Sequence, residues 1–143
     1  MANNCRFAFA VHVLSVMATH EGEAVSSELL ARSANTNPVV IRRLLGELRE
    51  AGLVQTTRGP NGGAQLAKPA QEISLLAVYH AAAGQVEPFG SHPNEPGKGC
   101  CVGREIKRVL EGVADRARAA VEKEYAATSL AQVVSEMQSP IES

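Results

Sequence analysis

The stretch that decides the fold is residues 35–67, which read NTNPVVIRRLLGELREAGLVQTTRGPNGGAQLA. An Asn cap at position 37 followed by Pro38 is a strong helix start, because proline at the first helical position loses no hydrogen bond. The helix ends near Gly52, where glycine serves as a C-terminal cap. Its predicted buried face consists of Val40, Leu44, Leu45 and Leu48.

A hairpin follows this helix directly. Residues 53–57 and 64–67 predict two short strands, and the intervening 58–63 reads RGPNGG, a turn of Gly, Pro and Asn. Upstream, residues 6–19 predict a helix that is apolar almost all round and therefore buried on most sides. Residues 27–33 predict a short helix with a Ser cap and an acidic first turn. This order of elements is that of a winged helix-turn-helix.

The second half of the chain is helical around one long loop. We expect helices over 73–83 and 128–137, and a loop over 84–101 that is rich in Gly and Pro. Residues 102–125 predict the longest helix, about 35 Å. Apolar residues recur along it at spacings of four and three: Val102, Ile106, Val109, Val113, Ala117 and Ala120. One small domain cannot cover this stripe, so we expect the same helix of a second subunit to pack against it.

The predicted fold class is therefore mainly α with a small β-hairpin: a winged helix-turn-helix plus a long dimerisation helix. We divide the chain into a DNA-binding domain, residues 1–68, and a sensing and dimerisation part, residues 69–143. The net charge of −1 hides an asymmetry between them. The first part has seven Lys or Arg against five Glu, whereas the second has seven basic against ten acidic residues. The basic excess lies where DNA would bind.

The residues at the start of the 38–50 helix fit a major groove. Asn37 and Val39 are short enough to touch base edges, and Arg42 and Arg43 can reach guanine or phosphate. Arg58 flanks a glycine-rich tip and can enter the minor groove. The alternative is a solvated arginine face on a dimeric protein-interaction scaffold without DNA binding. An enzyme is not expected, since no motif sets a base beside a nucleophile.

The chain resembles the Rrf2 family of bacterial winged-helix transcriptional regulators, which includes IscR, NsrR and CymR. The resemblance rests on RFAFAVHVL at the first helix, on residues 35–67, and on the ISLLAVYHAA helix after the wing. The stretch HPNEPGKGCCVG is similar to the YwnA-type subgroup. The resemblance implies a homodimer that represses or activates at a pseudo-palindromic DNA operator. It implies these DNA contacts: Arg6, Asn37, Pro38, Val39, Arg42, Arg43, Arg58, Asn61, Gly62 and Gly63.

The cysteines set this chain apart within the family. Cluster-binding members carry three separated cysteines in the loop, but here the loop has only the adjacent pair Cys100 and Cys101. No cofactor is therefore assigned, although an iron-sulfur cluster with a further ligand such as His92 stays open as an alternative, as does a small ligand. Lys98, Arg104 and a helix start favour thiol oxidation instead. The resemblance implies a dimer in which the first helix of one subunit lies near this loop of the other, and it thereby implies Cys5 of the other subunit as a resolving partner.

The cysteine pattern also bears on the compartment. Three cysteines without an even framework are typical of a reducing cytoplasm. The apolar run over 7–18 is interrupted by His12 and Ser15 and has no basic segment before it, so neither a membrane span nor a signal peptide is expected. We expect a cytoplasmic protein.

Overall fold

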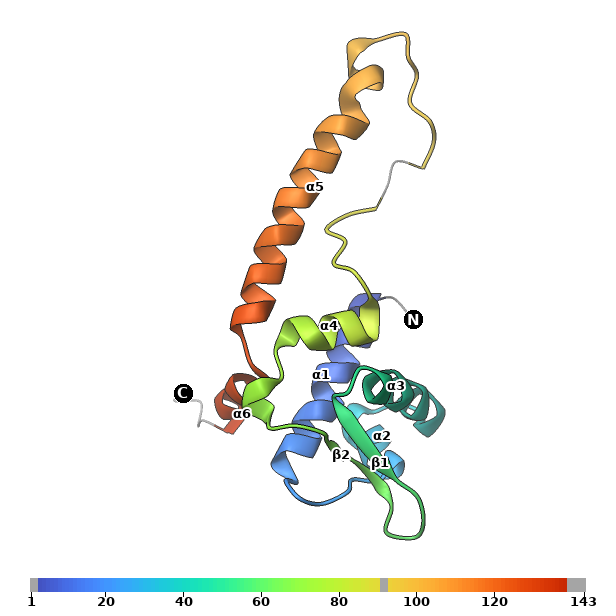
Figure 1. Ribbon diagram of the computed structural model, residues 1–143. Helices are drawn as coiled ribbons and strands as arrows, with labels where there is room; N and C mark the ends of the chain where they lie inside the picture. The colour runs from blue at the N-terminus through green and yellow to red at the C-terminus, as the bar shows by residue number, and fades with distance from the viewer. Residues whose placement is uncertain (1–2, 91–92, 139–143) are drawn as a thin grey trace, which may run out of the picture.

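The computed structural model describes residues 3–90 and 93–138, and one long helix extends from a small helical body (Figure 1). The long helix, α5 (Cys101–Ala127), has 27 residues and is about 40 Å long. The body comprises α1 (Asn3–Thr19), α2 (Ser27–Ala34), α3 (Pro38–Glu50), β1 (Val54–Thr57), β2 (Gly63–Leu66), η1 (Ala70–Glu72), α4 (Leu75–Ala83) and α6 (Leu130–Gln138). The mainly α fold with one small hairpin is confirmed.

Helix α1 forms the centre of the body. It packs against α2, α3, α4, α6 and β2, and its inner face is buried through Ala10, Val13, Leu14 and Met17. The prediction that α1 is buried on most sides is wrong for its outer face. Cys5 and His12 are exposed there, and the His12 ring lies 2.9 Å from the Ser33 hydroxyl of α2.

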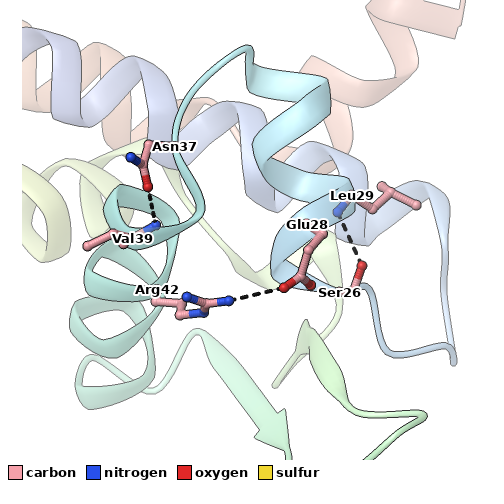
Figure 2. Close-up of polar contacts among 6 residues, drawn as sticks. All are labelled: Ser26, Glu28, Leu29, Asn37, Val39 and Arg42. Atoms are coloured by element: carbon pink, nitrogen blue, oxygen red, sulfur yellow. Dashed lines mark hydrogen bonds and ion pairs between the residues drawn. The ribbon is translucent and has the colours of Figure 1, made fainter.

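Helices α2 and α3 form the helix-turn-helix, and local signals define both starts. The Ser26 hydroxyl accepts a hydrogen bond from the Leu29 amide at 3.1 Å, and Asn37 caps α3 directly before Pro38 (Figure 2). Between the helices, Asn35 has φ 54°, a left-handed conformation that asparagine tolerates better than most residues. The turn between α2 and α3 is therefore tight.

The buried face of α3 consists of Ile41, Leu44, Leu45 and Leu48. The sequence-based prediction of Val40 in place of Ile41 is wrong by one residue, since Val40 is only partly buried. Because a helix advances 100° per residue, this error rotates one edge of the predicted face. The opposite face remains available to a partner.

The wing is a hairpin that a third segment extends. β1 and β2 pair antiparallel with Val54 opposite Leu66 and Thr57 opposite Gly63. Val25, just before α2, exchanges two backbone hydrogen bonds of 2.8 Å with Ala64. The sequence did not indicate this third pairing. It fixes the wing to the start of the helix-turn-helix.

The remaining boundaries differ from the predicted ones by one to three residues. α1 begins at Asn3 rather than at residue 6, and each strand begins one residue away from its predicted start. α4 begins after the cap Ser74, whose hydroxyl accepts a hydrogen bond from the Ala77 amide at 3.1 Å. α6 packs on α1 with Leu130 and Val134 buried, so the second half of the chain contributes to the body.

Candidate nucleic-acid interface

The exposed side of α3 carries the side chains expected to meet DNA. Val39, in the first turn, leaves 58% of its surface exposed although it is apolar. Arg42 and Arg43 are exposed on the next turn. Val39 is not part of the hydrophobic core, and an apolar side chain in this position can contact the methyl group of a thymine. The first two turns of α3 thus present one apolar and two cationic groups.

Asn37 is engaged in the fold. Its Oδ1 accepts a hydrogen bond of 2.7 Å from the Val39 amide, which caps α3. A bidentate contact with adenine needs both the carbonyl and the amide of an asparagine. The cap occupies the carbonyl, so only the side-chain NH₂ is left for DNA. Pro38 fills the first helical position and is partly buried.

Arg42 and Arg43 of α3 differ in their surroundings. Arg42 Nη2 donates a hydrogen bond of 3.0 Å to Glu28 Oε1, which lies in the first turn of α2 (Figure 2). Arg43, in contrast, has no hydrogen bond or ion pair to any residue that the structure describes. The sequence had assigned Glu28 only to the first turn of α2, since nothing local relates residue 28 to residue 42.

The wing tip lies beyond β1 and β2, and its Arg58 and Asn61 are exposed. Two glycines are required by close contacts: a β-carbon on Gly62 would collide with the Thr57 carbonyl oxygen, and one on Gly63 would collide with the Val25 carbonyl oxygen. Gly59 has φ 106°, a backbone conformation that favours glycine. Arg49 of α3 donates to the Thr56 hydroxyl at 3.3 Å and joins the helix to the hairpin.

Arg6 lies inside the body rather than at the α3 surface. Its Nε donates to the Ala82 carbonyl at 2.7 Å, and its guanidinium forms an ion pair with Glu47 of α3. The Arg6 side chain is 22% exposed to solvent. Arg6 therefore connects α1, α3 and α4, and its Nε and Nη2 are engaged by partners within the body.

The loop before α5 is fixed to the start of that helix. Arg104 donates to the Lys98 carbonyl at 2.9 Å, and Lys107 pairs with Glu95 at 2.6 Å. Cys100 caps α5, with its Sγ accepting from the Gly103 amide at 3.3 Å. Gly97 packs closely on Gly103, and a β-carbon on Gly103 would collide with the Gly97 carbonyl oxygen.

The three cysteines are exposed and form no disulfide, but they lie at two ends of the molecule. Cys100 and Cys101 are at the start of α5. Cys5 lies two residues before Phe7, whose ring stacks on Tyr125 near the end of α5 at 5.1 Å. The helix separates these two sites by about 35 Å. Cys5 can therefore reach the pair only from another subunit.

No group of three or more metal-ligating side chains is present among residues 3–90 and 93–138. The candidate ligand His92 lies outside the described residues. In the part of the chain that the structure describes, no helix combines the length and apolar character that a membrane span needs.

The apolar stripe of α5 is uncovered within one chain. Val102, Val109 and Val113 are exposed, and Ile106 is only partly buried. Near its other end α5 meets the body, where the rings of Phe7, Tyr79 and Tyr125 cluster with centroids 5.1 to 5.7 Å apart.

Comparisons with known proteins agree with this arrangement. YwnA of Bacillus subtilis, an HTH-type transcriptional regulator by name, is 40% identical over 134 residues, which cover 94% of this chain and 98% of YwnA. CymR, described as the global cysteine regulator of B. subtilis, superposes with a TM-score of 0.70 at 23% identity, covering 92% of this chain and 94% of CymR. The oxidised form of Staphylococcus aureus CymR superposes with a TM-score of 0.69 at 25% identity, covering 94% and 96%.

Residues 3–136 match the family described as Rrf2, iron-dependent transcriptional regulator. With the exposed α3, the wing beside it and a relative similar over nearly its full length, the chain belongs to the Rrf2 family of helix-turn-helix transcriptional regulators, a class of DNA-binding proteins that are not enzymes.

Proposed function

We propose that this protein is a homodimeric repressor that binds a pseudo-palindromic operator and is modulated by oxidation of its cysteines. The observation that carries the DNA part is the exposed first half of α3, where Val39, Arg42 and Arg43 stand clear of the core. Helix-turn-helix regulators insert this part of the recognition helix into the major groove. Arg58 and Asn61 of the wing would reach the neighbouring minor groove.

We propose fewer DNA-contacting residues than the family resemblance implies. Arg6 is left out because Glu47 and the Ala82 carbonyl engage it. Gly62 and Gly63 support the wing by permitting close backbone approach, and Pro38 shapes the start of α3. The remaining proposed DNA contacts are Asn37, Val39, Arg42, Arg43, Arg58 and Asn61.

The homodimer is supported by the uncovered stripe of α5, residues 102–125. Exposed apolar side chains at heptad-like spacing are stabilised when a second helix buries them. A twofold dimer would present two α3 helices to two half-sites. Residues 1–68 would then read DNA, and residues 69–143 would join the subunits and carry the sensing loop 84–101. Acting on chromosomal DNA, the regulator is assigned to the cytoplasm.

Thiol oxidation is supported by the exposure of all three cysteines. A peroxide would transfer one oxygen to the thiolate of Cys100 or Cys101, giving a sulfenic acid, and the thiol of the partner's Cys5 would displace water to form a disulfide. The S. aureus CymR structure in an oxidised form indicates that this fold accommodates oxidation. A change at the loop would alter the relative placement of the two α3 helices and weaken binding to half-sites of fixed spacing.

The DNA-binding proposal is tested by gel shift on the DNA upstream of the protein's own gene. We expect Arg42→Ala and Arg58→Ala each to weaken binding about tenfold, and wild-type binding to fall steeply with salt. Arg108→Ala, an exposed change on α5 away from α3, serves as the control and should leave binding unchanged. Full affinity in both α3 and wing variants would refute these contacts and favour the scaffold alternative.

The redox proposal is tested by non-reducing mass spectrometry after mild peroxide or diamide treatment. We expect a disulfide that contains Cys5, Cys100 or Cys101, with DNA affinity falling in parallel. Replacing all three cysteines with Ser should abolish the response. If the response persists, the loop senses another signal. An absorbance spectrum of anaerobically purified protein distinguishes the iron-sulfur alternative, since clusters absorb in the visible range.

A further inference from the structure

One ion pair joins the two helices of the helix-turn-helix across their exposed side. Glu28 is the second residue of α2, and Arg42 is the fifth residue of α3. Glu28 Oε1 and Arg42 Nη2 lie 3.0 Å apart (Figure 2). The Glu28 side chain is nevertheless 64% exposed and the Arg42 side chain 58% exposed. An exposed pair of this kind contributes little to folding stability. The pair lies on the proposed DNA-binding surface, where it can affect how DNA is bound.

A carboxylate in this position works against simple phosphate binding. The first helix of a helix-turn-helix crosses the DNA backbone, and a helix N-terminus is a natural anion site. Glu28 puts a negative charge into the first turn of α2, where its carboxylate repels phosphates. Its pairing with Arg42 also neutralises one of the two arginines in the first half of α3, Arg42 and Arg43. If the protein bound only the DNA backbone, the repulsion of phosphates by Glu28 and the neutralisation of Arg42 would both lower its affinity for DNA.

The same pair changes what Arg42 can do. Arginine has a planar fork of donors, and bonding one Nη2 hydrogen to a carboxylate restricts the orientations of that fork. The Nε and Nη1 donors of Arg42 make no hydrogen bond to the residues that the structure describes. A fork that is held toward one side and keeps unused donors matches the O6 and N7 acceptors of guanine in the major groove. Arg43, without such a partner, is free to follow a phosphate.

We propose that Glu28 is a specificity-determining residue that positions Arg42 to read a guanine and keeps it off the phosphate backbone. This inference rests on the proposed DNA-binding function. It separates the two arginines by role: Arg42 supplies sequence preference, and Arg43 supplies affinity that does not depend on sequence.

The test is selection from a double-stranded DNA library with a randomised core, carried out with the full-length dimer and followed by affinity measurements on the selected duplex. Wild type and Arg42→Ala together identify the base pair that Arg42 reads. We expect Glu28→Gln to lower discrimination at that same base pair about tenfold. We expect its affinity for mixed-sequence duplex to rise a few-fold and its salt dependence to steepen by about one unit in the log-log slope, because Arg42 becomes able to contact a phosphate.

Three variants serve as controls. Glu23→Gln removes the same charge from an exposed side chain of the α1–α2 loop and should leave the base preference unchanged. Arg43→Ala should weaken binding to all sequences alike. Glu28→Gln combined with Arg42→Ala should discriminate no worse than Arg42→Ala alone, because the two changes act through one contact. Thermal unfolding should be nearly the same for Glu28→Gln and wild type, so altered preference cannot be assigned to misfolding.

The inference is overturned if Glu28→Gln keeps the wild-type preference at the Arg42 base pair, or if its effect equals the uniform effect of Glu23→Gln. That result would leave wild-type selection intact and the proposed function standing. If wild type itself enriches no sequence, both the proposed function and the role of Glu28 are refuted.

Discussion

At the scale of single residues, Gly62 shows how the wing depends on the absence of a side chain. A β-carbon there would collide with the Thr57 carbonyl oxygen on the opposite strand of the turn. Backbone cannot move aside as a flexible side chain can, so the turn would have to open. Arg58 and Asn61 would move when the turn opens, because they lie on the same wing tip as Gly62.

We expect Gly62→Ala to lower stability by about 1–3 kcal/mol and to weaken DNA binding about as much as Arg58→Ala. Far-UV circular dichroism should stay unchanged, since no helix is affected. Gly46→Ala is the matched control: it lies inside α3 with open space around it, and it should raise stability by about 0.5–1 kcal/mol. Normal wing function in Gly62→Ala would show that the turn adapts.

Residue-level predictions succeeded where the deciding signal was local. The Asn37 cap and Pro38 were readable because both signals involve backbone within two positions. Arg6 was not readable in the same way. Its partners, Glu47 and Ala82, lie 41 and 76 positions away, and only the packed fold brings them to one place.

At the scale of elements, caps and turn residues predicted the helix order and the hairpin. The strand pairing at Val25 could not be predicted, because one extended residue carries no periodicity and its partner Ala64 is distant in sequence. The Val40 error on α3 has a similar origin. Val40 and Ile41 are both apolar, and only the packing of α3 against the surrounding elements decides which of them is buried.

The Arg6–Glu47 pair is the element-scale connection that we expect to be measurable. Glu47→Gln leaves a partly buried guanidinium with a weaker acceptor, so the free energy of unfolding should fall by about 1–2 kcal/mol. Glu50→Gln, an exposed carboxylate at the end of the same helix, should change it by less than about 0.5 kcal/mol. Urea unfolding measures both. Equal values for the two variants would contradict a structural role for the pair.

At the scale of the whole molecule, the uncovered stripe of α5 predicts how the chain associates. We expect Val109→Glu to convert the dimer to a monomer in analytical ultracentrifugation and to lower operator affinity by more than about tenfold, because a charge would be buried at the helix interface. Ala119→Glu adds the same charge on another face of α5, where the residue is exposed, and should remain dimeric. A Val109→Glu dimer of wild-type affinity would exclude α5 as the interface.

The stripe itself was readable from spacing, and so were the length and general position of α5. How α5 meets the body was not, because the cluster of Phe7, Tyr79 and Tyr125 draws on three separate segments of the chain. Aromatic rings in a sequence indicate burial, but they do not indicate which other rings they meet.

That aromatic cluster joins α5 to the body near the C-terminal end of the helix. A helix of about 40 Å that tilts by about 5° about Tyr125 carries its far end, with Cys100 and Cys101, through about 3 Å. Conversely, a displacement of this size at the loop requires only a small change in the angle at which α5 meets the three rings. Cys100 and Cys101 thus lie at the end of α5 where a given tilt of the helix produces the largest displacement.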